Sequence, residues 1–400
     1  MFNLMSNFSG SHQKMSVLKH RIVNYSYLCT QKSIINLPMK HYSWMAVSAL
    51  LLGFMMFNLT SCSKDDENGG TTPTEKEQGG KDDDKPVATS DVVVTVDDSG
   101  QADGGHRFVK IDDTNFYIDD IKYTATKGNL SVTGYNDAFF TGEARIISTL
   151  KYDGRTLNVV SISEGAFSNC EPLTSIYIPN TIKDIGTGAF INCPNLTKAE
   201  FASIVDLCQI SFSKRSNPLS IAHHLYVNGE EVRNLNIPNE ITSIKPYTFI
   251  GASYITSITF HDKVKNIGEY AFQDCYGITS LALPEGLESL GVYAFLSCKG
   301  LKTINIPRSL ATIGRGAFSS CVSISSIHIK DLPTWINNLN DIEDVLSGAT
   351  YRLYLNGDEV KVITIPDGYD YIRDNAFFRL PKYRRTHSSV FCRSPWNFFF

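Results

Sequence analysis

Apolar and polar positions recur along most of this chain at a fixed spacing. The segment LTSIYIPNTIKDIGTGAFINCPN has ungapped counterparts of 23 residues each, and they share the pattern L-x-x-I-x-I-P-x-x-[ILV]-x-x-[IL]-G-x-x-A-F-x-x-C with few departures. The four copies begin at Leu173, Ile255, Ile278 and Leu301. A partial copy ends at Cys170, and degenerate copies surround Pro238 and Pro366. Because no single unit can bury its own apolar face, this self-similarity predicts stacked units that share one core.

Each unit predicts the same three local structures. Its opening L-x-x-I-x-I segment alternates like a short strand, with Ile176 and Ile178 on one face. Pro179 lacks a backbone N–H and ends the pairing of that strand. Gly186 predicts a tight turn with a positive φ, and the A-F-x-x-C segment has the spacing of a helical turn that faces inward. The predicted fold class is a repeat solenoid, rich in β-strands with short helical turns.

Two of the units are longer than the others. The segment HLYVNGEEV in the first returns as RLYLNGDEV in the second, and the Asn-Gly pairs at 228–229 and 356–357 predict type I′ hairpin turns. Apolar, helix-like inserts begin at Phe201 in the first long unit and at Leu332 in the second. Duplication of a block that contains one long unit accounts for both.

Strand-like alternation with turn signals also runs from Phe116 to Ile162, and it predicts a cap of β-hairpins that shields the first unit. The chain therefore divides into five segments. These are a leader with a signal peptide (1–61), a disordered acidic tether (62–88), a β-rich cap (89–156), the solenoid (157–380) and an irregular tail (381–400). The tail departs from the repeat pattern, although its SSVFC segment is compatible with one more strand.

An uncharged apolar run before the tether has the character of an export signal. Residues 44–59 make up about 16 residues, fewer than the roughly 20 that a membrane-spanning helix needs. The run lies between a small basic region after Met39 and the sequence LTSC, which is the order of a signal peptide. LTSC resembles the lipobox of bacterial lipoproteins, which implies lipid attachment at Cys62 and a translation start at Met39. A transmembrane anchor is the alternative.

The residues that follow Cys62 carry a lysine and an acidic cluster. They are Ser63, Lys64, Asp65, Asp66 and Glu67. This sequence resembles the export signal that sends lipoproteins of the Bacteroidota type to the outer face of the outer membrane. A solvated linker is the alternative, because charge runs are common in linkers.

Composition and motifs narrow the function classes. A net charge of −4 gives no indication of a nucleic-acid partner. No phosphate-binding loop, dinucleotide fingerprint, serine-hydrolase elbow or zincin motif occurs in the sequence, so we expect no catalytic site, metal or cofactor. His223 and His224 are interpreted as packing residues rather than metal ligands. Residues 96–105 are interpreted as a loop, with weak calcium binding as the alternative, because they lack the EF-hand spacing.

The phenylalanines and cysteines of the A-F-x-x-C segments predict two buried columns. These residues are Phe167, Cys170, Phe190, Cys193, Phe272, Cys275, Phe295, Cys298, Phe318 and Cys321. A disulfide needs side-chain vectors that stacked parallel units supply poorly, and zinc needs four converging ligands. A structural role is therefore the leading interpretation, with disulfide and metal roles as alternatives.

The residue between the two inward positions of each strand is predicted to face outward. This outward column consists of Tyr177, Asn236, Thr259, Ala282, Asn305, His328 and Thr364. A mostly small and polar set of this kind favours a broad recognition surface over a catalytic pocket, which requires convergent titratable groups.

The I-P-x-x-[ILV]-x-x-I-G-x-x-A-F-x-x-C pattern resembles the BspA-like leucine-rich repeat family of bacterial cell-surface proteins over about residues 157 to 380. The resemblance implies a non-enzymatic surface lipoprotein whose solenoid adheres to protein ligands, namely host matrix or cell-surface proteins, or other bacteria. Because a fold does not fix a function, two alternatives stay open. They are an accessory glycan-binding lipoprotein and a structural envelope scaffold.

Overall fold

The computed structural model describes residues 91–338, 351–364 and 384–386. The chain divides into two compact units, 1–80 and 81–400, and every described residue belongs to the second. The predicted signal peptide, the lipid site at Cys62, the export signal at 63–67 and the SSVFC segment lie outside the described residues.

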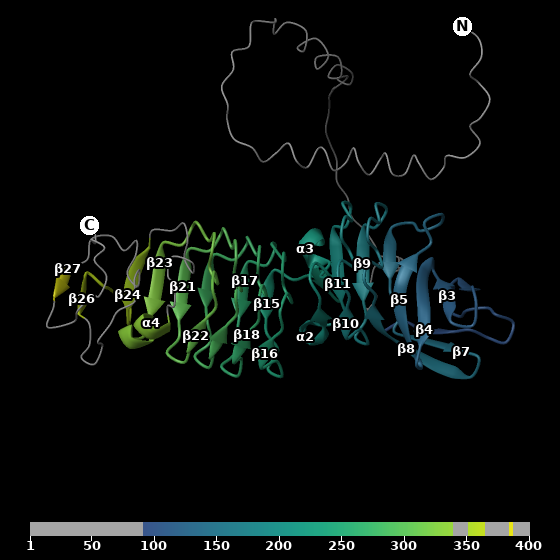
Figure 1. The fold of residues 1–400 in the computed structure, drawn as a ribbon, viewed down its shortest axis with the longest axis horizontal. Coiled ribbons are helices and arrows are strands. Elements are labelled where there is room, and N and C mark those ends of the chain that lie inside the picture. Colours follow the sequence, from purple (N-terminus) through teal and green to yellow (C-terminus); the bar gives the residue numbers. More distant parts are fainter. Residues whose placement is uncertain (1–90, 339–350, 365–383, 387–400) are drawn as a thin grey trace, which may run out of the picture. The chain divides into compact units, whose positions relative to one another are not determined.

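The first part of the described chain is a twisted sheet built from hairpins (Figure 1). Its strands follow the order β1-β7-β8-β5-β4-β3-β2. They are β1 (Val93–Thr95), β2 (Phe108–Lys110), β3 (Asn115–Ile118), β4 (Ile121–Thr126), β5 (Asn129–Tyr135), β7 (Thr149–Tyr152) and β8 (Arg155–Ile162). Alternate residues such as Ile121 and Tyr123 are fully buried, as the period of two in the sequence predicts.

This sheet continues into the repeat stack without a break. The end of β8 pairs in parallel with β10 (Asp184–Ile185), the second strand of the next unit. The short strand β6 (Glu143–Arg145) pairs with β9 (Ser175–Ile178), so it is already the first member of the main strand ladder. The stack therefore begins within the range predicted as the cap.

The L-x-x-I-x-I segments form parallel strands that stack from unit to unit (Figure 1). The first block has the order β6-β9-β11-β13-β14, and later blocks join β15 to β17 and β19-β21-β23-β24-β25. The outer strands β14 and β25 pair in antiparallel with β13 and β24, as the second strands of the two hairpins. Their bounds are β11 (Lys198–Phe201), β13 (Leu225–Val227), β14 (Glu230–Glu231), β15 (Asn234–Asn236), β17 (Ser257–Thr259), β19 (Ser280–Ala282), β21 (Thr303–Ile306), β23 (Ser326–Ile329), β24 (Arg352–Leu355) and β25 (Asp358–Glu359). Residues in equivalent repeat positions, such as Ile304 and Ile327, lie in register. Register of this kind places the inward isoleucines in one continuous core.

A second ladder runs along the opposite side of each unit. Two-residue strands follow the end of β8 in the order β8-β10-β12, and others pair as β16-β18-β20-β22. They are β12 (Ser211–Phe212), β16 (Ser243–Ile244), β18 (Asn266–Ile267), β20 (Ser289–Leu290) and β22 (Thr312–Ile313). Near the end of the described chain, β26 (Val362–Thr364) pairs in parallel with β27 (Arg384–Thr386). The predicted irregular tail therefore contributes one strand, which pairs in parallel with β26.

The repeated glycine is required for a reason other than the one predicted. Gly186 does not have a positive φ. A Cβ at this position would lie 2.4 Å from the backbone nitrogen of Glu164 in the preceding unit, and Gly268, Gly291 and Gly314 are equally confined. The glycine is needed because two backbones approach closely at this point.

The A-F-x-x-C segments form turns, and the predicted helical turn is wrong. In the unit that contains Phe190, the residues before Ala189 and before Cys193 both have left-handed backbones, with φ of 63° at Gly188 and 58° at Asn192. Two left-handed residues within a stretch of five prevent a continuous helix. The turns instead join each other along the stack, as in the 2.8 Å bond from Phe272 N–H to the carbonyl oxygen of Ala294.

The phenylalanines of these turns form a buried column. Phe272 and Phe295 stack with ring centroids 5.0 Å apart, and Phe295 and Phe318 with centroids 5.5 Å apart. All ten residues of the two predicted columns are at most 2% exposed. The six described cysteines are buried and free of disulfides.

Both long units contain the helical inserts that the sequence predicts. These are α2 (Ile204–Gln209), whose first turn is capped by the Ser203 hydroxyl, and α4 (Leu332–Asn338). Both predicted Asn-Gly pairs adopt positive φ at both residues, as a type I′ turn requires. A further helix, α3 (Leu219–Ala222), was not predicted.

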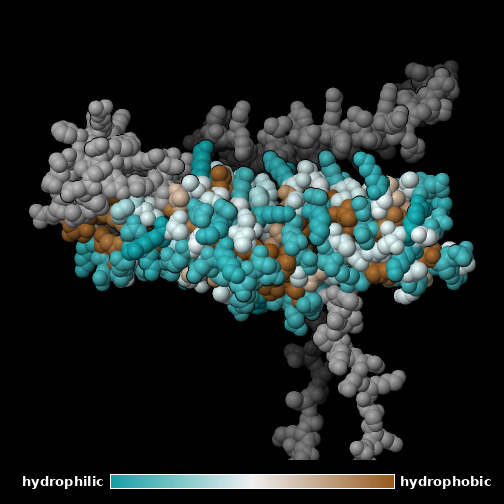
Figure 2. Space-filling model, turned by 90° about the horizontal axis from the view of Figure 1, so that it is seen from below, coloured by the Kyte–Doolittle hydropathy of each residue, from teal (hydrophilic) through white to brown (hydrophobic). Residues whose placement is uncertain are grey.

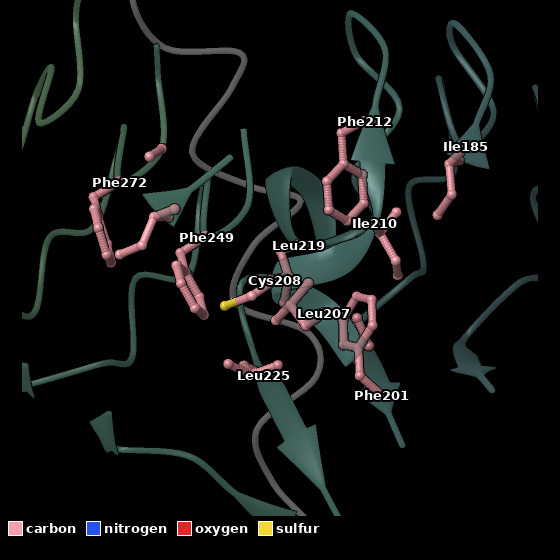
Figure 3. Packing of buried hydrophobic residues seen from close by; sticks show 14 of the residues in the cluster. Ile185, Phe201, Leu207, Cys208, Ile210, Phe212, Leu219, Leu225, Phe249 and Phe272 are labelled. Carbon is pink, nitrogen blue, oxygen red and sulfur yellow. The ribbon is translucent and has the colours of Figure 1, made fainter. Parts of the chain in front are cut away.

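The helices α2 and α3 interrupt the stack between the two halves of the repeat array (Figure 1). The phenylalanine column stops at Phe190 and resumes at Phe249. Figure 3 shows Leu219 of α3 and Cys208 of α2 packed beside Phe249 at this point. Apolar side chains from the insert therefore keep the core continuous where the repeat itself is missing.

Candidate binding site

The predicted outward column comes together in the C-terminal half of the strand ladder. Asn305 pairs in register with Ala282 on one side and His328 on the other, and His328 pairs with Tyr354. The His328 imidazole and the Tyr354 ring stack with centroids 4.5 Å apart, at 11°. We call these four residues the C-terminal strand face. Tyr354 was missed because it lies in a long unit, where the repeat spacing changes.

A pocket of about 380 Å³ opens beside this face. Its lining includes Asn305, His328 and the hairpin residue Asn356, together with one acid, Glu285, and one base, Lys330. Neither charged side chain forms an ion pair with another described residue. The pocket therefore offers one group of each charge to a ligand, together with the His328 imidazole, on which Tyr354 stacks from outside the lining.

The remaining members of the outward column are placed differently. Asn236 and Thr259 pair with each other and are exposed. The backbone of Thr364 lies in β26, and its side chain is outside the described set.

Tyr177 was expected to be exposed, and this expectation is wrong. Its side chain is only 4% exposed, and the Arg145 guanidinium lies 4.3 Å from its ring centroid. On its other side, in register, is Glu200, which is buried and forms a 2.9 Å ion pair with Lys198. Long side chains on neighbouring strands cover one another here, so this end of the ladder offers less free surface than the C-terminal strand face.

An aromatic ladder that the sequence analysis did not single out runs along the turns. Tyr247, Tyr270 and Tyr293 stack with centroid separations of 5.3 and 5.2 Å. They occupy the position just before the A-F pair, or before Thr-Phe for Tyr247. Burial, followed by the Glu269 carboxylate, raises the pKa of both Tyr247 and Tyr270. The sequence did contain a signal for this ladder, because tyrosine recurs every 23 residues in the segments K-P-Y, G-E-Y and G-V-Y of successive units.

The histidine pair contributes to packing at the interruption. The Nδ1–H of His223 donates to the carbonyl oxygen of Gly251 at 2.9 Å. His224 contacts Glu231 through Nδ1 at 2.5 Å and stacks on Tyr254 with centroids 3.7 Å apart. In the sequence, no acidic residue stands at a metal-site spacing from His224. The hairpin of the first long unit nevertheless places Glu231 beside it. The His224 contact, with Arg233 as a second partner, lowers the pKa of Glu231.

Two further sequence candidates have local structural roles. In the 96–105 segment, the Asp97 carboxylate accepts hydrogen bonds from the backbone N–H groups of Ser99 and Gln101, so it organises the loop. Burial raises the pKa of the Cys193 thiol to about 11 and that of Cys208 to about 12. Across 91–338, 351–364 and 384–386, no group of three or more His, Cys, Asp or Glu side chains is placed to hold a metal ion.

The surface seen in Figure 2 is mixed in character. Its hydrophobic residues lie in small groups among hydrophilic ones. This face therefore has no large apolar area of the kind that marks an obligate protein interface.

A family model described as the BspA-type leucine-rich repeat region matches the chain in six copies, over residues 154–224 and 219–340. Residues 154–340 are a BspA-type leucine-rich repeat region. Repeats of this class generally form binding or scaffold domains, and stacked units present an extended surface for partners. No curated protein gives a match.

Several solved structures resemble the chain. A leucine-rich repeat protein from Bacteroides ovatus is 22% identical, with 68% of this chain and 76% of that chain covered and a TM-score of 0.37. The T. pallidum leucine-rich repeat protein is 20% identical, with coverages of 52% and 78% and a TM-score of 0.29. The pneumococcal vaccine antigen PcpA is 13% identical, with coverages of 71% and 99% and a TM-score of 0.33. These TM-scores are too low to support an inference about function.

No helix in the described part of this leucine-rich repeat chain combines the length and the apolar character needed to cross a membrane.

Proposed function

We propose that this leucine-rich repeat protein is a surface lipoprotein that adheres to protein ligands through its C-terminal strand face. The observation that carries the proposal is the convergence of Asn305, His328 and Tyr354 beside a pocket of about 380 Å³. The stacked His328–Tyr354 pair supplies an aromatic anchor of the kind that dominates protein interfaces. Glu285 and Lys330 add charges that can select a complementary partner.

The class of partner follows from the repeat type and the export sequence. An outward-facing adhesin meets host matrix proteins and host cell-surface proteins. It also meets the surface proteins of other bacteria. Lipid attached to Cys62 would anchor the chain, and residues 63–67 would direct it to the outer face of the outer membrane. More than one acyl chain is needed for firm anchoring, which a lipoprotein anchor provides.

Display on the cell surface is tested by protease treatment of intact cells, with a periplasmic protein as the control. We expect the repeat region to be digested while the control survives. In the Cys62→Ala variant we expect the protein to leave the membrane fraction. Protection of the repeats from protease would exclude adhesion and favour an envelope scaffold, and a membrane-bound Cys62→Ala variant would disprove the lipid anchor.

The binding face is tested by comparing two tyrosines in equivalent hairpin positions. Tyr354 belongs to the C-terminal strand face, whereas Tyr226 lies in the first long unit with the Lys198 ammonium 4.8 Å from its ring. We expect Tyr354→Ala to reduce adhesion to immobilised matrix proteins or to cells by about tenfold or more, which corresponds to about 1.4 kcal/mol. Tyr226→Ala should leave adhesion unchanged. Equal effects of the two variants would place the interface elsewhere.

A further inference from the structure

A second pocket lies where the repeat is interrupted, away from the C-terminal strand face. It has a volume of about 410 Å³, within the range of about 300–1,000 Å³ typical of small-molecule sites. One wall is the segment 213–217, between β12 and α3, and the other is formed by Tyr247, Glu269, Tyr270 and Gln273. We call it the junction pocket. It exists because the insert takes the place of a regular turn in the stack.

The interruption is held open by side-chain hydrogen bonds. In regular units, the carbonyl just before the phenylalanine accepts from a backbone N–H of the preceding unit, as the Ala271 carbonyl oxygen accepts from the Phe249 N–H at 2.8 Å. At the junction, the buried Asn217 amide donates instead to the carbonyl oxygens of Tyr247 and Thr248, at 2.8 and 2.9 Å. These bonds satisfy the backbone without a stacked turn, so the space in front of Tyr247 is left to the pocket.

The tyrosine ladder ends at this space. The ring of Tyr270 covers one face of Tyr247, at an interplanar angle of 11°. Among the described residues no second ring stacks on Tyr247, which lines the junction pocket together with the segment 213–217. At the far end of the ladder, Gly316 closes against Tyr293, because a Cβ on that glycine would lie 2.3 Å from the Tyr293 ring. The ladder therefore has one closed end and one end that opens into the junction pocket.

The backbone under this ladder is strained. The three tyrosines have φ of 63°, 54° and 55°, whereas the equivalent position in other units is glycine, as at Gly188. A bulky residue in the left-handed region costs free energy of order 1 kcal/mol, and such strain gathers at functional sites. Arg215, on the opposite wall, also has a positive φ of 56°. Both walls of the pocket thus keep large side chains where glycine is favoured.

The charged groups around the pocket have no partners within the described residues. Lys214, Arg215 and Glu269 form no ion pair or side-chain hydrogen bond there. The two bases lie on one wall and the acid on the other. A polyanion would meet Glu269 as a like charge, whereas a ligand with one carboxylate and several hydroxyls can use both walls.

We propose that the junction pocket binds a sugar residue that carries a carboxylate. The C–H bonds on one face of the sugar ring pack on the exposed face of Tyr247, whose π-electrons are negative. Lys214 and Arg215 bind the carboxylate. Glu269 and Gln273 accept hydrogen bonds from the ring hydroxyls. Uronic acids and sialic acids both have this chemistry.

The test measures binding of the full chain to four probes by calorimetry. These are methyl galacturonoside, which carries one carboxylate, its neutral counterpart methyl galactoside, sialyllactose and lactose. We expect one acidic probe to bind at least about tenfold more tightly than its neutral partner. Which acidic probe binds identifies the source, uronic acid or sialic acid. Absence of binding to all four probes at about 10 mM, or equal binding of acidic and neutral forms, overturns the proposal.

Two tyrosine variants provide a matched comparison. Tyr247 and Tyr293 share the ladder position, the stacking and the backbone strain, but only Tyr247 lines the pocket. We expect Tyr247→Leu to weaken binding of the acidic probe by about tenfold or more and Tyr293→Leu by less than about twofold. Lys214→Gln with Arg215→Gln should remove the preference for the acidic form. Equal losses in the two tyrosine variants, at similar thermal stability, contradict the site.

The result is independent of the protein-adhesion function. Tyr354→Ala should bind the acidic sugar as the unaltered chain does, because Tyr354 does not line the junction pocket. Tyr247→Leu should in turn retain adhesion to proteins. Loss of sugar binding in Tyr354→Ala would show that sugars bind at the C-terminal strand face instead, and would overturn the junction site.

Discussion

The Sγ–H of Cys298 donates to the carbonyl oxygen of Phe272 at 3.2 Å, across one unit of the stack. The same bond joins Cys193 to Phe167, Cys275 to Phe249 and Cys321 to Phe295, at 3.0 to 3.3 Å. Each thiol fills a small space in the core and also satisfies a backbone acceptor there. Alanine would match the size approximately without the donor, which gives a physical reason for cysteine at this position.

The first prediction concerns the phenylalanine column. Phe295 is fully buried between Phe272 and Phe318. We expect Phe295→Ala to lower the free energy of unfolding by about 3–5 kcal/mol, because the neighbouring units cannot close the cavity. Val292, which is 37% exposed, is the control, and its replacement by Ala should change stability by less than about 0.5 kcal/mol. Denaturant unfolding measures both. Similar costs at the two positions would contradict the burial of the column.

The second prediction concerns the close approach of backbones at the repeated glycine. A Cβ on Gly291 would lie 2.6 Å from the backbone nitrogen of Glu269. We expect Gly291→Ala to destabilise the fold by about 1–3 kcal/mol, because the two units must move apart. At Gly134 the nearest atom is 3.9 Å from the added Cβ, so Gly134→Ala should be nearly neutral. Equal thermal denaturation midpoints of the two variants would show that the stack accommodates the methyl group.

The third prediction concerns alkaline pH. Burial raises the pKa of Cys208 to about 12, whereas an unfolded thiol titrates near about 8.5. The unfolded chain therefore loses this proton first as the pH rises. The stabilisation is fully present below about pH 8.5 and is lost as the pH rises toward 12. When the free energy of unfolding is measured by denaturant titration across this pH window, it should decline less in Cys208→Ala than in the unaltered chain. An identical decline in the two proteins would mean that folding does not shield the Cys208 thiol from deprotonation.

The fourth prediction concerns the junction. Asn217→Ala leaves the carbonyl oxygens of Tyr247 and Thr248 without their side-chain donor. The Tyr247 carbonyl oxygen keeps the Ile250 N–H as a donor at 3.3 Å, so the Thr248 carbonyl oxygen is the one left without a partner. A buried group without a partner costs about 1–3 kcal/mol, and we expect the free energy of unfolding to fall by that amount or more. Hydrogen exchange should rise first in the units next to the interruption. Asn305→Ala, at an exposed position, is the control. Exchange that rises evenly along the stack would argue against a local role for Asn217.

Much of the fold was predictable because the repeat copies one set of contacts. The inward positions Ile176 and Ile178 are buried, and the hairpin turns at 228–229 and 356–357 form as predicted. Spacing carries this information, since side chains one repeat apart must meet in register. The same spacing did not reveal that Gly186 is needed for close approach rather than for a positive φ, because both requirements select glycine.

The sequence by itself determined the stacked repeat, its inward columns and its long units, because periodic contacts leave a periodic record in the residues. Only the tertiary structure decided that Tyr177 is covered by Arg145, that Tyr354 completes the C-terminal strand face, and that the tyrosine ladder opens at the insert. These features arise where the period changes. Contacts between Asn217 and the turn at Tyr247, 30 residues apart, follow from how the insert packs, and no repeat spacing encodes them.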